Sequence, residues 1–193
     1  MLIVVRHGRT AANAAGRLLG RADPPLDDLG LRQAGGLAAA LGPVDRVVSS
    51  PLLRCRSTAA GFGVPVEVDE RWIELDYGEW DGSVLGDLPA SLWSAWRADV
   101  EFAPPGGESL VALGERVRAA ADDLAADARD RSVVVVTHVS PIKAALAWAL
   151  GVGDDVAWRA FVAPASVTRI AVGDRGPSLV GFNDTGHLDG IGS

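Results

Sequence analysis

"LIVVRHGRTAAN", residues 2–13, contains the transition that predicts the fold. An uninterrupted apolar run ends abruptly at Arg6-His7-Gly8. Such a run without alternation is typical of a strand that is buried on both faces, as in a parallel sheet. In open α/β sheets, ligands bind beyond the carboxyl ends of the strands. A cation and an imidazole at that end are therefore candidate ligand-binding groups.

Two later stretches share this layout. "VDRVVSSP" (44–51) and "SVVVVTH" (132–138) each lead into a helical pattern, with Pro51 and Pro141 placed where a first helical turn is expected. Glu108 is expected in the first turn of another helix, where the helix dipole favours a carboxylate. The predicted helices are 28–41, 51–61, 85–98, 107–129 and 141–150, followed by a strand-turn-strand within 156–182 and an irregular tail after Asn183. This pattern indicates an α/β fold with a parallel sheet.

Composition limits the size and the partners of the protein. With 193 residues and 48% hydrophobic content, we expect one domain, 1–193, with a small cap at about 72–106. The net charge of −7 and the lack of a basic stripe argue against a nucleic-acid partner. The longest apolar helix candidate, residues 142–152, is about half as long as a bilayer span, so no membrane partner is expected.

Cys55 is the single cysteine, which excludes an internal disulfide framework and a multi-cysteine metal site. We expect it to be a small buried apolar residue rather than a nucleophile. Because Arg6-His7 interrupts the first apolar run, residues 2–5 do not resemble a signal peptide. These observations predict a cytoplasmic protein with no metal and no cofactor.

Basic side chains gather at the expected strand ends. Arg6 and His7 follow the first strand, Arg54 lies just after Ser49-Ser50, and His138 follows the strand at 132–137. His7 and His138 meet if the first and fourth strands are neighbours. Arginine forks match the oxygens of a phosphate group, and an unprotonated imidazole beside that phosphate is a competent nucleophile. The pattern therefore predicts a phosphate site with a histidine nucleophile.

Attack on a phosphate ester also needs an acid for the leaving group. "WIELDYGEWDG" (72–82) offers four candidates beside aromatic rings, and an apolar environment helps a carboxyl group to hold a proton. The candidates are Glu74, Asp76, Glu79 and Asp81. The residue pattern alone leaves the choice among them open.

Five blocks in order resemble the histidine phosphatase superfamily, the phosphoglycerate-mutase-like phosphatases. They are Arg6-His7-Gly8 with Asn13 and "GRLLGRADPPLDDLGLRQA", "SSPLLRCRSTA", "ELDYGEWDG", "PPGGESL" and "VVVVTHVSPIK". "HVSPIK" and "NDTGHL" further resemble the acid phosphatase domain of actinobacterial bifunctional ribonuclease H/phosphatases and the α-ribazole phosphatases. The resemblance implies a three-layer fold, with a mostly parallel central sheet flanked by helices.

The resemblance also implies roles for the site residues. His7 would be phosphorylated during turnover, and Arg6, Arg54, His138 and Asn13 would bind the phosphate. Glu74 would be the proton donor, and no metal would be needed. Arg9 and Leu19 depart from the family pattern, which leaves the identity of the substrate open.

The function that this resemblance implies is a metal-independent phosphomonoesterase, which hydrolyses small phosphorylated metabolites through a phosphohistidine. A phosphoglycerate-type mutase and a non-catalytic phosphate-binding interaction module are the alternatives. The chain lacks the longer insertions of the mutases, which favours hydrolysis. A homodimer is a possible assembly.

Two groups of residues stay open at this point. Arg9, Arg17 and Arg21 are either ordinary surface charges or an extension of the positive pocket toward a second anionic group. Trp93 and Trp96, three residues apart on an expected helix, are predicted to pack the cap segment on the sheet.

Overall fold

The computed structural model describes residues 1–191 and is built on a six-stranded sheet with the order β3-β2-β4-β1-β5-β6. Strands β3, β2, β4 and β1 are parallel, β5 is antiparallel to β1, and β6 is antiparallel to β5. The strands are β1 (Leu2–Arg6), β2 (Arg46–Ser49), β3 (Val66–Val68), β4 (Val133–Thr137), β5 (Val167–Gly173) and β6 (Gly176–Asp184). The predicted mostly parallel sheet is confirmed.

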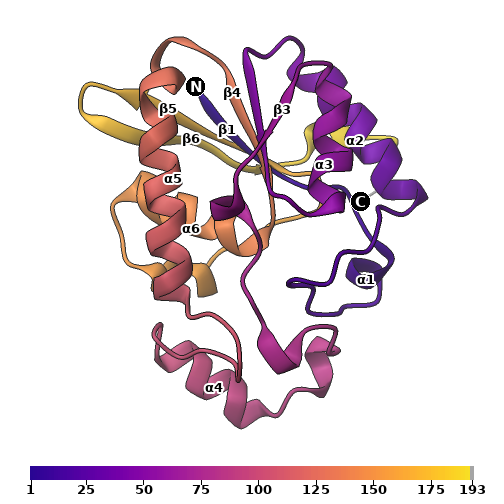
Figure 1. Cartoon of the computed structure of the whole chain (residues 1–193), viewed down its shortest axis with the longest axis vertical. Helices are drawn as coiled ribbons and strands as arrows, with labels where there is room; N and C mark the ends of the chain where they lie inside the picture. Colours follow the sequence, from indigo (N-terminus) through magenta and orange to yellow (C-terminus); the bar gives the residue numbers. More distant parts are fainter. Residues whose placement is uncertain (192–193) are drawn as a thin grey trace.

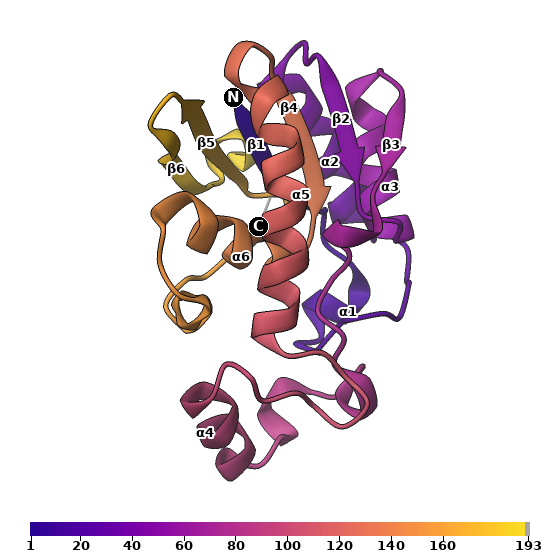
Figure 2. The same cartoon turned by 60° about the vertical axis from the view of Figure 1, so that its left-hand side comes forward.

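Helices cover both faces of this sheet (Figures 1 and 2). Val4 of β1 packs in a core with Val117 of α5 (Leu110–Asp130), which lies beside α6 (Val139–Leu150). The next residue, Val5, packs in a second core with Leu37 of α2 (Asp28–Leu41) and Ala59 of α3 (Leu53–Ala59). Successive strand side chains point to opposite faces, so the central strands are apolar on both. The predicted three-layer architecture is confirmed.

The segment between the sheet and α5 occupies one end of the molecule, drawn at the bottom of Figure 1. It contains the 3-10 helices Gly78–Trp80 and Leu85–Asp87 and the helix α4 (Ala90–Ala98). The short helix α1 (Ala11–Ala14) lies toward the same end. The other 3-10 helices are Ala60–Phe62, Glu70–Trp72, Asp154–Trp158 and Gly186–Leu188. One domain with a cap at about 72–106 stays a prediction.

Two predicted helix starts were wrong. Helix α3 begins at Leu53 rather than Pro51, because the Leu53 N–H donates to the carboxylate of Asp23 and the chain before it is extended. Helix α5 begins at Leu110, because the side chain of Ser109 caps it by accepting the N–H of Ala112. Glu108 therefore lies before the helix and not in its first turn.

The other predicted helices agree with the structure to different degrees. Helix α2 spans the predicted 28–41, and α6 begins two residues before Pro141, which lies in its first turn. The predicted helix 85–98 divides into a 3-10 turn and α4, with Pro89 at the N-cap. The tail is less irregular than expected, because β6 continues to Asp184 and a 3-10 helix follows. None of the helices within residues 1–191 has both the length and the apolar character that a bilayer span requires.

Candidate active site

The two histidines follow the ends of neighbouring strands. In the parallel pair of β1 and β4, Arg6 lies opposite Thr137, so His7 and His138 leave the sheet side by side. Their ring centroids are 5.1 Å apart, with an angle of 65° between the planes. The condition under which the two histidines meet, neighbouring first and fourth strands, is therefore fulfilled.

His7 is almost fully buried and has a defined tautomer. Its Nδ1 lies 2.7 Å from the carbonyl oxygen of Gly8, and a carbonyl can only accept, so Nδ1 carries the proton. Nε2 is therefore unprotonated and has no hydrogen-bond partner among residues 1–191. Burial, with the charges of Arg6 and Arg54, holds the pKa of His7 well below 6.5. A neutral imidazole with a free lone pair is the form that attacks phosphorus.

Arg6 and Asn13 lie in the same cavity as His7. The Nη1 of Arg6 donates to the carbonyl of Val162 at 2.7 Å, while its buried Nε has no partner in the part of the chain that the structure describes. Burial lowers the pKa of Arg6 to about 10, so it is still a cation at neutral pH. Asn13 accepts from Thr10 through Oδ1, which leaves its amide N–H groups for another acceptor. Both residues offer donors to an anion.

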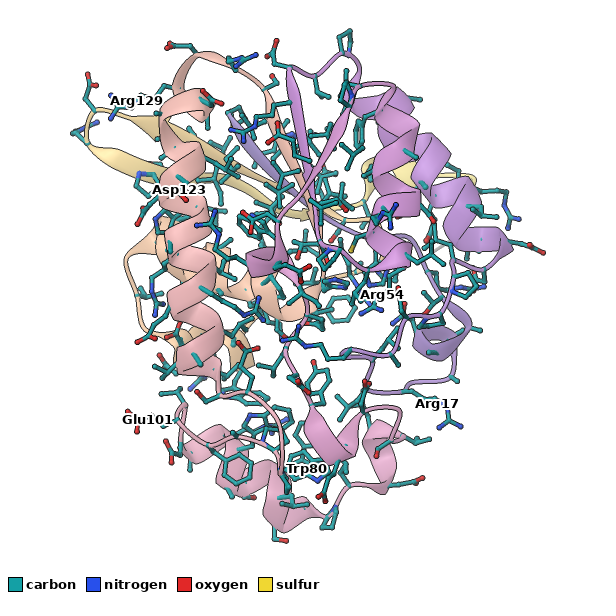
Figure 3. The ribbon with its side chains drawn as sticks, in the orientation of Figure 1. Arg17, Arg54, Trp80, Glu101, Asp123 and Arg129 are labelled. Carbon is teal, nitrogen blue, oxygen red and sulfur yellow. The ribbon has the colours of Figure 1, made fainter. Side chains whose placement is uncertain are left out.

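Arg54 and His138 are fully buried and hydrogen-bonded to protein groups. Arg54, which is labelled in Figure 3, donates through Nε to Nδ1 of His138 at 3.2 Å, and its terminal nitrogens donate to the carbonyls of Gly20 and Ala22. Because Nδ1 of His138 accepts, Nε2 carries the proton and donates to Ser50 Oγ at 2.7 Å. Burial lowers the pKa of both residues. The structure thus brings them to His7, but neither lines the cavity.

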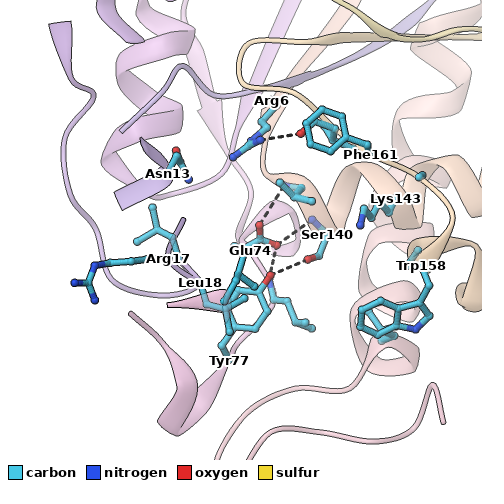
Figure 4. A pocket seen from close by; sticks show the side chains of 18 of the residues that line it. Arg6, Asn13, Arg17, Leu18, Glu74, Tyr77, Ser140, Lys143, Trp158 and Phe161 are labelled. Carbon is cyan, nitrogen blue, oxygen red and sulfur yellow. Dashed lines mark hydrogen bonds between the residues drawn. The ribbon is translucent and has the colours of Figure 1, made fainter. Parts of the chain in front are cut away.

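Glu74 is the one candidate acid among the four that lines the cavity within residues 1–191. Its carboxylate accepts the backbone N–H groups of Leu75 at 2.8 Å and of Val139 and Ser140 at 3.1 Å (Figure 4). The last two form the first turn of α6, where the helix dipole favours a carboxylate.

The other three acids lie elsewhere. Asp76 accepts the N–H of Gly78, and Asp81 accepts the N–H groups of the loop 20–22. Glu79 is not part of the cavity wall. The structure therefore favours Glu74 as the acid.

Cys55 is buried beside His138, with its Sγ 3.3 Å from Nε2. Burial raises the pKa of the thiol far above its ordinary value, so the sulfur is not a thiolate nucleophile. This agrees with the sequence prediction. Within residues 1–191, no group of three or more His, Cys, Asp or Glu side chains is arranged to hold a metal.

The cavity has a volume of about 660 Å³ and is larger than a phosphate group needs. Beyond His7 and Glu74, it is lined by aromatic residues and by cations that the sequence analysis did not assign to the site. These residues are Tyr77, Trp93, Trp96, Trp158 and Phe161, with Lys143 and Arg97. Lys143 lies four residues after Val139 and three after Ser140, which both line the cavity, so helical spacing could have indicated it.

Of the three arginines left open, only Arg17 lines the cavity, and it donates to the carbonyl of Gly82. Arg9 pairs with Asp27 at 2.8 Å, and Arg21 lies beside Asp76 and Glu108.

Trp96 belongs to the core that also contains Val4 and Val135 of the sheet, and Trp93 packs against that core. They pack against each other and against Trp158, with ring centroids 5.3 to 6.5 Å apart, and form part of the cavity wall.

A neutral imidazole flanked by guanidinium groups, with a carboxyl group in the same cavity at the end of a three-layer α/β sheet, defines the class of enzymes that move phosphoryl groups through a histidine. The chain belongs to the histidine phosphatase superfamily, because the model of its branch 1 matches residues 2–185. The predicted family is confirmed.

Similar proteins include phosphatases. The bifunctional protein Rv2228c of Mycobacterium tuberculosis is 35% identical over 97% of this chain, and the chain spans about half, 54%, of the length of that relative. An adenosylcobalamin/alpha-ribazole phosphatase of Salmonella typhimurium is 35% identical over 71% of this chain and 73% of its own. The solved structure of a phosphoserine phosphatase of Entamoeba histolytica with 3-phosphoglyceric acid matches with a TM-score of 0.90 and 26% identity, over 97% of this chain and 98% of that one.

Proposed function

We propose that this protein is a phosphomonoesterase that hydrolyses small phosphorylated metabolites through a phosphohistidine on His7 and needs no metal ion. The observation that carries the proposal is the state of His7: its Nδ1 donates to Gly8, so its Nε2 lone pair is free at a cavity that also contains Arg6 and Glu74. The names of the similar proteins support the same reaction class.

In the first half-reaction, Nε2 of His7 attacks the phosphorus and the bond from phosphorus to the ester oxygen breaks. Glu74, in its protonated form, gives its proton to the leaving oxygen, so the alcohol departs neutral. The phosphoryl group is then bonded to Nε2, and Nδ1 keeps its hydrogen bond to Gly8, which stabilises the charge on the ring.

In the second half-reaction, the Glu74 carboxylate takes a proton from water and the oxygen of that water attacks phosphorus. The bond from phosphorus to Nε2 breaks, and inorganic phosphate leaves. Glu74 is protonated again and His7 is neutral again, so the cycle closes.

The negative charge on the phosphoryl oxygens must be stabilised by hydrogen-bond donors around the phosphoryl group. Arg6 and Asn13 line the cavity with unpartnered N–H groups and can bind these oxygens directly. Arg54 and His138 reach them by exchanging hydrogen bonds that now go to Gly20, Ala22 and Ser50. Because guanidinium groups supply the positive charge, activity should be unchanged by EDTA.

The test is capture of the intermediate. A ³²P-labelled phosphomonoester is mixed with the protein and quenched within the first turnover. Acid-labile, base-stable label on His7 is expected, and the label should pass to water. His7→Ala should abolish labelling and turnover, and His138→Ala should nearly abolish turnover.

Three outcomes separate the alternatives. Label that passes to a sugar acid rather than to water would indicate a phosphoglycerate-type mutase. Phosphate-ester binding without label or turnover, equal in the parent protein and His7→Ala, would indicate a non-catalytic binding module. Labelling that persists in His7→Ala would place the nucleophile elsewhere and overturn the proposal.

Organisation and location are proposed on the sequence pattern. We propose one domain, 1–193, with a cap at about 72–106, acting in the cytoplasm on a small phosphorylated metabolite and not on nucleic acid or a membrane. Analytical ultracentrifugation distinguishes a monomer from the possible homodimer.

A further inference from the structure

The part of the cavity beyond the phosphate site has an apolar, aromatic wall. Trp93, Trp96 and Trp158 line this part and pack against one another edge to face and face to face. Phe161, labelled with Trp158 in Figure 4, also lines the cavity and is 73% exposed. Covering the exposed aromatic surface of a cavity with an apolar ligand is favourable, because it removes apolar area from water. The ring faces themselves offer no hydrogen-bond partners to the hydroxyl groups of a sugar.

Buried donors in this wall lack acceptors. The indole N–H groups of Trp96 and Trp158 are both buried, and neither has a hydrogen-bond partner within residues 1–191. Both nitrogen atoms are closed off from solvent, so these N–H groups are not offered to a ligand in the cavity.

Lys143 is the only lysine in the chain, where every other basic side chain apart from histidine is an arginine. It lines the cavity from α6, and Figure 4 shows it on the same side as Trp158. Lys143 makes no hydrogen bond or ion pair with any residue that the structure describes. Glu74 is close enough to interact with its charge, but the Glu74 oxygens already accept three backbone N–H groups. The ammonium group therefore lacks a direct partner.

We propose that the substrate is a phosphomonoester whose flat aromatic body carries a second negative charge. This proposal rests on the phosphatase function proposed above. The phosphate binds at His7 and Arg6, the aromatic body lies against Trp93 and Trp158, and Lys143 binds the second anion. Lys143 has no hydrogen-bond or ion-pair partner within residues 1–191, and Trp93 and Trp158 both line the cavity, with Arg97 over their rings.

The test uses three phosphate esters of primary alcohols, so that the leaving groups are similar. They are glycerol 3-phosphate, 2-phenylethyl phosphate and 2-(4-carboxyphenyl)ethyl phosphate. The aromatic ring should raise kcat/KM about tenfold over the glycerol ester through burial of apolar surface. The carboxylate should raise it about tenfold again through a charge-assisted hydrogen bond.

Variants test which residue is responsible for each of the two increases in kcat/KM. Lys143→Gln should reduce the carboxylate-to-phenyl ratio of kcat/KM from about ten to about one. Trp93→Ala should reduce the phenyl-to-glycerol ratio. Arg175→Gln, which removes an exposed cation in the turn between β5 and β6, should leave both ratios as they are.

Two kinetic results would overturn the proposal. In the first, kcat/KM is higher for the glycerol ester than for both aromatic esters. In the second, Lys143→Gln lowers kcat/KM by the same factor for all three esters. The second result would mean that Lys143 acts on the shared phosphate or on Glu74. Calorimetry with the three matching phosphonates gives the same ranking by affinity without turnover. If the affinities of the phosphonates follow the expected order and no ester is hydrolysed, the phosphatase proposal fails and the proposed ligand class stands. If the three phosphonates bind with equal affinity, the proposed ligand class is overturned.

Discussion

His7 owes its reactivity to two local features, the Gly8 carbonyl that fixes its tautomer and the burial that keeps it neutral. Protonation of Nε2 would remove the nucleophile, so activity is present above the folded-state pKa of His7 and is lost as the pH falls through it. Since that pKa lies well below 6.5, we expect kcat/KM to keep its value as the pH falls past 6.5. Rates with p-nitrophenyl phosphate across pH 4 to 8 check this, and an acid limb centred near 6.5 would contradict it.

The contribution of Glu74 to the rate should be larger for esters whose leaving oxygen must be protonated as it departs. In Glu74→Gln, turnover of an alkyl phosphate should fall by about 10²- to 10⁴-fold, while p-nitrophenyl phosphate should lose much less. Loss of the hydrogen bonds to Val139 and Ser140 would lower both rates alike, so the ratio of the two rates is the measurement. Equal losses would mean that another group is the acid.

Single residues also show what sequence can and cannot predict. His7, Arg6 and Glu74 stand in blocks whose order identifies them, and the structure places all three in one cavity. Lys143 stands at the end of the block "VVVVTHVSPIK", but the sequence alone assigns it no role in the site. Helical spacing from Val139 and Ser140 indicates its position only once those two residues are known to line the cavity.

At the scale of elements, the loop that carries His7 is pressed against the start of α2. A Cβ on Gly30 would collide with the backbone of Arg9, and one on Gly8 would collide with the carbonyl of Gly30. Gly30→Ala should therefore destabilise the protein by about 1–3 kcal/mol and lower kcat, because the displaced loop carries the nucleophile. Urea unfolding and kcat measure the two effects.

The same helix provides the control. Gly35 lies in α2 on an open face, where an added Cβ would meet nothing within 4 Å. Gly35→Ala should raise the free energy of unfolding by about 0.5–1 kcal/mol, since glycine in a helix interior costs backbone entropy, and kcat should not change. If Gly30→Ala behaved like Gly35→Ala, the close contact would not position the loop.

The start or end of a helix was predictable where residues next to it in the sequence determine it. It was not predictable where a residue far away in the sequence determines it. Asp27 caps α2 through Gly30, a pattern visible in the sequence. The start of α3 depends on Asp23, thirty residues earlier in the chain. Glu108 was expected to stabilise a helix terminus, but it pairs with Arg116 at 2.7 Å.

At the scale of the whole molecule, the apolar runs at 2–5 and 133–136 were enough to predict a parallel sheet, because strands buried on both faces need helices on both sides. The shape of the substrate cavity was not predictable. Its wall joins residues from α4, from the 3-10 helix Asp154–Trp158 and from α6, and only tertiary packing brings these together.

Placing two neutral histidines in the core should make stability depend on pH. Burial holds the pKa values of His7 and His138 well below 6.5, the value expected in the unfolded chain. Above 6.5 neither state binds these protons, and the stability is fully present. Below 6.5 the unfolded chain binds protons that the folded chain does not, so stability is lost as the pH falls.

While a histidine stays neutral in the folded state, it lowers the free energy of unfolding by about 1.4 kcal/mol for each pH unit below 6.5. His187, whose pKa partial burial also lowers, acts in the same direction. Urea unfolding between pH 7.5 and 5.5, a range above most carboxyl titration, should show a plateau and then a decline. His138→Gln should make the decline shallower by one histidine's share, even if it lowers stability at every pH. A constant free energy of unfolding across this range would mean that the buried histidines gain protons in the folded protein as readily as in the unfolded chain.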